Sequence, residues 1–437
     1  MKTVLLLLDG IGDRSYPVLG YRTPLQAAET PNLDRLAALG GSGLYHAAHC
    51  GQCLPSEAAH YLLFGYRLSD FPGRGLLEAV GEGVPFEKDD VLCLAHFAGV
   101  KWKQGVPFLV HGRDHIEGNR GEIGMLMRAI TPFEAEGVLF ELHQTRRNDA
   151  ILVLRGAVSP FVSDSDPIVL ERPVAAVLPL LGNPEYHAAS RTAGAMNRYL
   201  AHCHEVLTHH EMNQKRREQG RTPANFLVTQ RCGRRVKAVP FGEQWGLRGM
   251  VIASGSVYAG IAHELGLDFF RVKDTEDPGV DLQGRIRLAL EDDSHDFIHV
   301  HTKVPDEASH KGDPEKKRDA ISRLDRGLVD LVTVMEQGEN ILLVVTADHS
   351  TPSDSVLIHS GEPVPLCFVG KCVRRDAVSK YDEVNCSRGC LGFLRREELM
   401  YMILNYSDRS SLLGHCIGPV QRPYVPFDYD PFRENGP

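Results

Sequence analysis

No long hydrophobic run occurs in this sequence of 437 residues. A helix that spans a membrane needs roughly 20 consecutive, mostly apolar residues, and no segment approaches that length. The apolar run Thr3–Leu8 is also shorter than the core of a signal peptide, and it ends in Asp9 without a small-residue cleavage site. We therefore interpret this run as a buried first strand, and we expect a cytoplasmic protein with no membrane partner.

Positive charge is not in excess, because the formal net charge is −9 at pH 7. An acidic balance disfavours binding to a nucleic-acid backbone or to an anionic membrane. Phosphate-binding loops are missing as well. The glycine pairs Gly73/Gly75 and Gly81/Gly83 lack the Lys-Ser/Thr of a P-loop, and neither forms a dinucleotide fingerprint. We therefore expect no nucleic-acid partner and no phosphoryl transfer driven by a bound nucleotide.

The ten cysteines do not resemble a disulfide framework, because they are scattered and most lie inside apolar runs. The one close pair, Cys50 and Cys53, has no second pair at the spacing of a zinc ribbon. Two ordinary thiols are therefore a simpler interpretation of this pair than a redox or zinc site.

The residues that are present have the composition of an ordinary globular protein, with 43% hydrophobic and 24% charged residues. From about residue 240 to 400, short apolar runs alternate with helical patterns, which predicts an α/β fold: a mostly parallel, doubly wound sheet with helices on both faces. The predicted strands are 3–8, 250–253, 297–301 and 341–346, and the predicted helices are 31–39 with Thr30 as N-cap, 257–265 and 316–336.

The middle of the chain has a different pattern. Between about residues 80 and 235 the runs 91–98, 108–111, 138–142 and 151–155 read as strands with few helices between them. This pattern predicts an α+β domain inserted into the first one. We expect the core to comprise residues 1–76 and 239–437 and the inserted domain to comprise 77–238.

Acidic residues and histidines follow three of the apolar runs. They are Asp9 after the first run, Asp306 and His310 after the second, and Asp348 and His349 after the third, with His359 one short loop later. In open α/β sheets, ligands bind beyond the carboxyl ends of the strands. Three carboxylates and three imidazoles at one edge suit two divalent ions better than one. Asp306 and His310 are four residues apart, so one helical turn could present both to an ion, although an acidic first helical turn is a common alternative.

Ser56 follows Pro55 at the start of a predicted helix. A serine in this place is commonly an N-cap. The dipole and free amides of the same helix end also favour an incoming phosphate, and a nearby divalent ion would lower the pKa of the hydroxyl. Ser56 can therefore be an N-cap and a nucleophile for phosphoryl transfer at the same time.

Several short motifs occur together along the chain. They are Asp9-Gly10, Thr23-Pro24, the segment 30–34, Pro55-Ser56, Gly73-Arg74-Gly75 with Glu78-Ala79, the segment 306–310, and the segment 346–352, with 153–156, 163–167 and 223–225 in the predicted insertion. Together they resemble the archaeal-type cofactor-independent phosphoglycerate mutases, which belong to the alkaline phosphatase superfamily. The resemblance runs from residue 1 to about 400.

The resemblance implies an alkaline-phosphatase-like core with a mobile cap inserted after the nucleophile. It implies one divalent ion held by Asp9, Ser56, Asp348 and His349, and a second held by Asp306, His310 and His359, with Mn²⁺, Zn²⁺ and Mg²⁺ all compatible. Ser56 would accept the phosphoryl group from one hydroxyl of the bound glycerate and return it to the neighbouring hydroxyl, which would interconvert 2- and 3-phosphoglycerate, while cap closure excludes water. The candidates for contacts to this anionic substrate are Arg74, Arg113, Arg155 and Arg231.

The inserted region departs from the family pattern. The segment 96–100 reads His-Phe-Ala-Gly-Val where the family has Asn-Phe-Ala-Thr-Val, and Asn148-Asp149 stands where the family has His-Arg. Replacing a cation that faces a phosphate by a carboxylate exchanges attraction for repulsion. The alternative function is therefore a metal-dependent phosphatase, hydrolase or phosphotransferase acting on another small phosphorylated or phosphonate metabolite. A catalytically silent scaffold with the same fold is a third interpretation.

Overall fold

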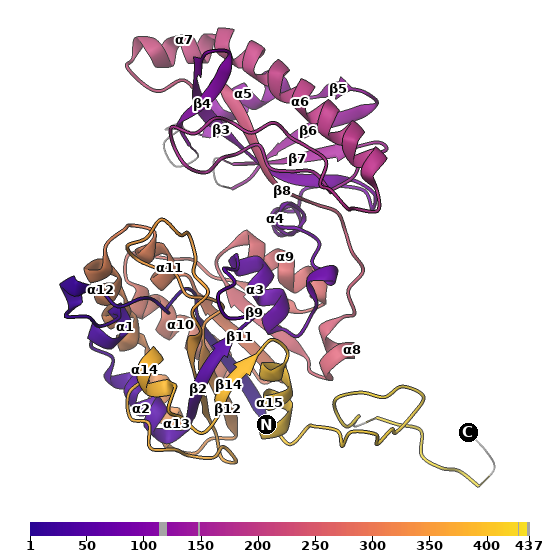
Figure 1. The fold of residues 1–437 in the computed structure, drawn as a ribbon. Helices are drawn as coiled ribbons and strands as arrows, with labels where there is room; N and C mark the ends of the chain where they lie inside the picture. The colour runs from indigo at the N-terminus through magenta and orange to yellow at the C-terminus, as the bar shows by residue number, and fades with distance from the viewer. Residues whose placement is uncertain (113–119, 147–148, 427, 435–437) are drawn as a thin grey trace. The chain divides into compact units, whose positions relative to one another are not determined.

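The computed structural model describes residues 1–112, 120–146, 149–426 and 428–434. Its internal contacts divide the chain into two compact units (Figure 1). The first unit contains residues 1–71 and 238–437, and the second contains 72–237. The boundary predicted after residue 76 would cut helix α4 (Arg74–Glu82), which lies whole in the second unit.

The first unit is built on an eight-stranded sheet with the strand order β10-β9-β11-β1-β12-β13-β2-β14. Among these described strands only β13 runs antiparallel to its neighbours, so the sheet is mostly parallel. The central strands β1, β11 and β12 are almost completely buried, because helices cover both faces of the sheet. The strands are β1 (Lys2–Leu8), β2 (Gly41–His46), β9 (Gly249–Ala253), β10 (Asp268–Arg271), β11 (Phe297–Thr302), β12 (Ile341–Thr346), β13 (Val364–Val369) and β14 (Gly392–Arg395).

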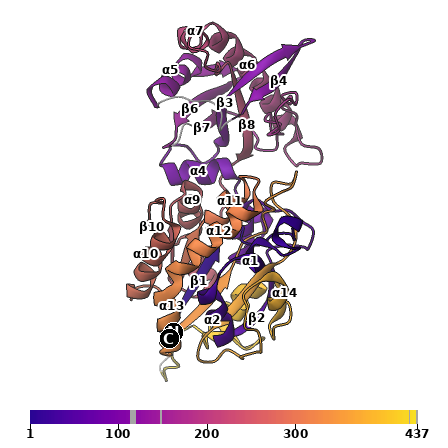
Figure 2. The ribbon, with the colours of Figure 1, turned by 90° about the vertical axis from the view of Figure 1, so that its left-hand side faces the viewer.

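Two layers of helices enclose this sheet (Figures 1 and 2). One layer contains α2, α10, α12 and α13, which contact one another, and the opposite layer contains α3 and α9. This architecture confirms the predicted fold class, an α/β fold with a mostly parallel sheet. The helices are α1 (Pro24–Ala27), α2 (Pro31–Leu39), α3 (Ser56–Leu63), α8 (Phe241–Trp245), α9 (Ser256–Leu265), α10 (Pro278–Glu291), α11 (Val304–Ser309), α12 (Pro314–Asp325), α13 (Val329–Glu336), α14 (Glu383–Cys386) and α15 (Glu398–Tyr406).

The single helix predicted over residues 316–336 is wrong, because α12 and α13 are separated by a 3-10 turn at Arg326–Leu328. The turn lies against α10. A Cβ atom on Gly327 would lie 2.3 Å from the carbonyl oxygen of Gly279. Apolar residues keep their helical spacing across the turn, and for this reason the pattern alone did not reveal the break.

The second unit is an antiparallel sheet with helices packed against it. Its strand order is β4-β3-β7-β6-β5, and β8 pairs with β3. A disulfide between Cys93 and Cys232 joins β3 to β8, although the scattered cysteines did not indicate disulfide bonding; the two cysteines are 139 residues apart in sequence. The elements are α4, β3 (Val91–Lys103), β4 (Val106–His111), α5 (Arg120–Ile130), β5 (Phe133–Ala135), β6 (Val138–Gln144), β7 (Ala150–Arg155), α6 (Tyr186–His209), α7 (Glu211–Glu218) and β8 (Phe226–Gly233). No helix among the described residues of either unit has the length and apolar character to cross a bilayer.

The N-terminus of α2 is capped by a residue that is distant in sequence. Thr30 occupies the N-cap position as predicted, but its side chain makes no capping hydrogen bond. The Asp325 carboxylate accepts from the backbone N–H groups of Asn32 at 3.0 Å and Leu33 at 2.8 Å. Asp325 therefore satisfies two of the free amides that begin α2, and it ties α12 to α2.

We expect Asp325→Ala to destabilise the first unit by about 1–3 kcal/mol, because the substitution leaves two amides of α2 without their acceptor. Thr30→Ala should cost less than about 0.5 kcal/mol, because no capping bond is lost. Urea denaturation followed by circular dichroism measures both values. Equal effects of the two substitutions would contradict the assignment of the cap to Asp325.

Candidate active site

The predicted acidic residues and histidines lie together beyond the carboxyl ends of three adjacent strands. Asp9 follows β1, Asp306 lies in the short helix α11 after β11, and Asp348 follows β12. The backbone ties these segments directly: the Asp306 N–H donates to the Asp9 carbonyl at 3.0 Å, and the Gly10 N–H donates to Asp348 Oδ1 at 3.3 Å. The parallel register of the three strands therefore determines the spacing between the carboxylates.

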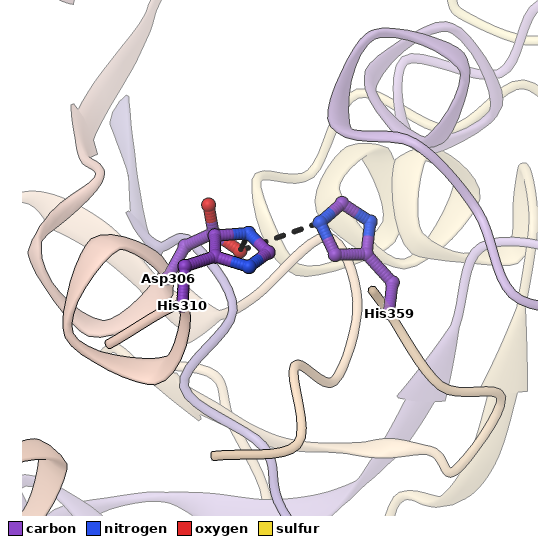
Figure 3. Close-up of side chains that lie close together, drawn as sticks. All are labelled: Asp306, His310 and His359. Atoms are coloured by element: carbon purple, nitrogen blue, oxygen red, sulfur yellow. Dashed lines mark ion pairs between the residues drawn. The ribbon is translucent and has the colours of Figure 1, made fainter. Parts of the chain in front are cut away.

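Asp306, His310 and His359 form one group whose ligand atoms all lie within 4.8 Å of one another (Figure 3). Asp306 Oδ1 lies 3.3 Å from His310 Nε2 and 3.4 Å from His359 Nε2. The Asp306 carboxylate is buried, and the His310 side chain is 43% exposed. The other ring nitrogen of His359 lies 2.6 Å from the Leu54 carbonyl, which orients the ring.

Asp9, Asp306 and His349 form a second group of the same size, and all three residues are buried. His349 Nε2 lies 3.5 Å from Asp9 Oδ1 and 3.2 Å from Asp348 Oδ2. Asp306 thus belongs to both groups, whereas the sequence analysis gave it to one ion only. The Asp348 carboxylate, predicted to bind the first ion, lies beside this group without belonging to it.

The electrostatics of the second group fit a divalent cation. Asp9 Oδ1 and Asp348 Oδ2 are buried and accept no hydrogen bond from the described part of the chain. Burial lowers the pKa of His349, but the carboxylates of Asp348, Asp9 and Asp306 outweigh burial and raise this pKa to about 9. Carboxylates and imidazoles that attract positive charge so strongly are the donor set that divalent ions take in proteins.

Ser56 lies beside this group, as the first residue of α3. Its buried hydroxyl Oγ is 3.0 Å from His349 Nε2. Pro55, not Ser56, occupies the N-cap position of α3, so the prediction of an N-cap at Ser56 is wrong by one residue. The hydroxyl is consequently available to groups outside the helix.

Lys303 is a functional candidate that the sequence analysis missed. Its ammonium lies 3.2 Å from Asp9 Oδ2, 2.9 Å from Asp306 Oδ2 and 3.3 Å from Ser56 Oγ. Burial would lower the pKa of Lys303, but the Asp9 and Asp306 carboxylates raise it well above its usual value. The sequence does contain one indication of its role: Lys303 lies three residues before Asp306, immediately after β11.

Two further side chains hold the Asp9 carboxylate. Tyr258 donates its hydroxyl hydrogen to Asp9 Oδ2 at 2.8 Å, and His301 Nε2 lies 3.0 Å from the same oxygen. The His301 and Tyr258 rings pack with their centroids 3.8 Å apart. Both residues are buried, so Asp9 is held in one position from the interior of the sheet.

The predicted substrate-binding arginines belong to the second unit. Arg74 forms an ion pair with Glu78 at 2.8 Å, and Arg155 forms ion pairs with Asp90 at 3.2 Å and Glu141 at 2.6 Å. The backbone of Arg231 is in the left-handed region at φ 54°, and its N–H donates to Asp164 Oδ1 at 2.6 Å. Arg113 lies outside the described residues. The roles of these four arginines stay predictions.

A network of buried charged and polar side chains surrounds Asp13, which lies four residues after Asp9. The Asp13 carboxylate accepts from Ser353 Oγ at 2.7 Å and from the Tyr16 hydroxyl at 2.7 Å, and it pairs with the Lys317 ammonium at 3.1 Å. Glu383 of α14 accepts from the Asp13 N–H at 3.1 Å. Burial raises the pKa of Glu383 to about 7.

Comparison with known proteins identifies relatives along nearly the whole chain. Residues 1–406 match the metalloenzyme superfamily. The chain is 41% identical to the 2,3-bisphosphoglycerate-independent phosphoglycerate mutase 2 of Methanocaldococcus jannaschii over 435 residues, which is 98% of each chain. It is 36% identical to the 2,3-bisphosphoglycerate-independent phosphoglycerate mutase of Methanopyrus kandleri, over 94% of this chain and 98% of that protein.

Two solved structures resemble the fold. A protein from Pyrococcus horikoshii has a TM-score of 0.75 at 27% identity, covering 95% of this chain and 99% of the other. A cofactor-independent phosphoglycerate mutase from Thermoplasma acidophilum has a TM-score of 0.60 at 29% identity, covering 93% of this chain and 100% of the other.

The chain therefore belongs to the 2,3-bisphosphoglycerate-independent phosphoglycerate mutase family of the metalloenzyme superfamily. This membership confirms the resemblance seen in the motifs and the prediction of a metal-dependent phosphoryl-transfer enzyme. It also confirms the prediction of divalent metal ions, for which the two groups of Asp and His side chains are the candidate ligands.

We expect the Glu383 carboxyl to make stability depend on pH. Below pH 4.5 the group is protonated in both the folded and the unfolded protein. Between pH 4.5 and 7 the unfolded protein ionises first, so the folded protein loses up to about 3 kcal/mol of stability relative to a variant that cannot ionise. Urea midpoints of wild type and Glu383→Gln across this range should therefore shift in favour of the variant as pH rises. Glu291→Gln, an exposed control, should show no such trend, and parallel curves for Glu383→Gln would contradict the raised pKa.

Proposed function

We propose that the protein is a metal-dependent, 2,3-bisphosphoglycerate-independent phosphoglycerate mutase that interconverts 3-phosphoglycerate and 2-phosphoglycerate in the cytoplasm. The observation that carries the proposal is the position of the Ser56 hydroxyl, which lies between His349 and Lys303 beside the buried carboxylate of Asp9. A nucleophile in such a place, in a chain with these relatives, is suited to receive a phosphoryl group.

The residues present fit two divalent ions. Asp9, Ser56, Asp348 and His349 would hold one ion, and His310 and His359 would hold the other with Asp306. Support for this assignment comes from the two groups of converging ligand atoms and from the buried oxygens of Asp9 and Asp348 that lack hydrogen-bond donors in the described residues. When bound, the ions would lower the pKa of the serine hydroxyl and neutralise charge on the transferring oxygens.

The chain's own residues would carry the transfer as follows. Ser56 Oγ attacks phosphorus, the bond from phosphorus to one glycerate oxygen breaks, and a phosphoserine forms, while the proton lost by the serine hydroxyl is replaced by one on the departing glycerate oxygen, so that a free hydroxyl results. The neighbouring hydroxyl of the bound glycerate then attacks the same phosphorus and restores Ser56. Lys303, whose ammonium is 3.3 Å from Ser56 Oγ, is placed to stabilise negative charge on the phosphoryl oxygens in both steps.

Phosphorus NMR tests the proposed reaction. With 3-phosphoglycerate, Mn²⁺ and no bisphosphoglycerate, we expect 2-phosphoglycerate to appear. Ser56→Ala should lower the rate at least ~1,000-fold, because the nucleophile is lost. Ser294→Ala, an exposed serine that precedes β11 at the end of the strand opposite the site, should leave the rate unchanged. Formation of inorganic phosphate alone would favour the alternative of a phosphatase, and no reaction by metal-loaded protein would point to a different substrate.

Metal analysis tests the ligand assignment. Asp306 would hold the second ion and also lies within the group that contains Asp9 and His349, so Asp306→Ala should release the second ion and weaken the binding of the first, whereas His359→Ala should remove about one ion. Activity should fall at least ~100-fold in Asp306→Ala, which is more than the loss expected from changing a residue that only orients a metal ligand. Equilibrium dialysis with elemental analysis gives the stoichiometry, and His187→Gln, an exposed histidine of the second unit, is the control. Two tightly bound ions in Asp306→Ala would contradict the assignment.

A further inference from the structure

Lys317 is a completely buried lysine whose ammonium contacts four oxygen atoms. It lies in α12, and its side chain has 0% exposure. The ammonium donates to the backbone carbonyls of Gly10 at 2.9 Å, Gly12 at 3.0 Å and Thr351 at 2.8 Å, and it pairs with Asp13 Oδ2 at 3.1 Å. None of these four oxygens belongs to the candidate metal ligands or to Ser56.

The four oxygens come from the two loops that carry the candidate ligands. Gly10, Gly12 and Asp13 belong to the turn that begins with Asp9, and Thr351 belongs to the loop that begins with Asp348 and His349. One ammonium therefore joins the loop after β1 to the loop after β12. The two loops also meet directly, because the Thr351 N–H donates to the Gly12 carbonyl at 2.9 Å.

Two of the residues that Lys317 holds also form hydrogen bonds directly to candidate ligands. The Gly10 N–H donates to Asp348 Oδ1 at 3.3 Å, and Thr351 Oγ1 donates to Asp306 Oδ1 at 2.8 Å. Gly10 has φ +67°, and a Cβ atom there would lie 2.8 Å from the Asp306 Cβ, so the turn is packed too tightly to relax. A shift of the Gly10 or Thr351 backbone would therefore move Asp306 and Asp348 relative to each other.

An ammonium suits this place better than other side chains. It has three N–H donors on one atom, so it can serve three carbonyls that converge on one point. Burial lowers the pKa of Lys317, and the Asp13 carboxylate opposes this shift and compensates the buried charge. An apolar side chain of the same length would leave converging carbonyl dipoles and the Asp13 carboxylate without their cation.

We propose that Lys317 is a positioning residue of the metal centre: by holding the carbonyls of Gly10, Gly12 and Thr351, it sets the distance between the ligand loops after β1 and β12. The inference rests on the proposed function for the identity of the metal ligands. It assigns Lys317 no contact with substrate. Loss of the Lys317 ammonium should consequently weaken metal binding and leave the affinity for substrate nearly unchanged once metal is saturating.

The test is Mn²⁺ binding to full-length Lys317→Met, measured without substrate by electron paramagnetic resonance of free Mn²⁺. We expect the dissociation constant to rise at least tenfold, within the range for residues that orient metal ligands. At saturating Mn²⁺ we expect KM to change less than twofold. Lys316→Met is the matched control, because that lysine is adjacent in α12 and 67% exposed; its dissociation constant should equal that of wild type.

A double substitution separates positioning from simple charge compensation. If Lys317 only neutralises Asp13, then Asp13→Asn combined with Lys317→Met should restore wild-type Mn²⁺ affinity, and that result would overturn the proposal. If Lys317 positions the carbonyls, the double variant should bind Mn²⁺ as weakly as Lys317→Met alone. Unchanged affinity in Lys317→Met would also overturn it.

Folding is checked by near-UV circular dichroism. Should Lys317→Met not fold, the double variant Asp13→Asn/Lys317→Met replaces it, because that variant leaves no buried carboxylate without a cation; a folded double variant with wild-type affinity would overturn the proposal, and a tenfold weaker one would support it. Because Mn²⁺ binding is measured without substrate, this result stands apart from the mutase assay. Weak Mn²⁺ binding in the variant together with no mutase activity in wild type would refute the proposed function and leave the positioning role in place.

Discussion

Three carboxylates buried at one edge of a parallel sheet are the constraint on which the rest of this structure depends. Asp9, Asp306 and Asp348 are each at most 2% exposed, and they converge from three adjacent strands. Buried charges of the same sign are costly unless cations or hydrogen-bond donors face them. The surrounding structure supplies both, with the ammonium of Lys303 between two of the carboxylates and the imidazole of His349 beside the third.

The same arrangement explains why phosphoryl transfer suits this site. A region that holds carboxylates by means of bound cations is positive toward an incoming anion once those cations are in place. Ser56 stands at the beginning of α3, where the backbone amides also point outward. Ser56 is thus placed by a helix end, and the three carboxylates are placed by segments that follow strand ends. Both kinds of element are rigid, which is what a reaction that depends on alignment requires.

The second unit contains the arginines predicted to contact the substrate, and two of them form ion pairs within that unit. Arg74 and Arg155 are both paired with carboxylates of their own unit, so a substrate anion would compete with those carboxylates for the guanidinium groups. His96, which replaces an asparagine of the family pattern, lies 3.2 Å from Asp166. His96, Arg74 and Arg155 therefore each pair with a carboxylate of the second unit.

The sequence by itself determined the strands and the residues that follow them. Continuous apolar runs such as Ile341–Thr346 admit few structures other than a strand buried on both faces, and polar residues at their ends predict a site at one edge. Only the tertiary structure decided how those residues combine. It placed Asp306 in both candidate ligand groups, brought Lys303 beside Ser56, and assigned the cap of α2 to Asp325. The reason is physical: local patterns record which face of an element is buried, but distances between side chains depend on the packing of elements far apart in sequence.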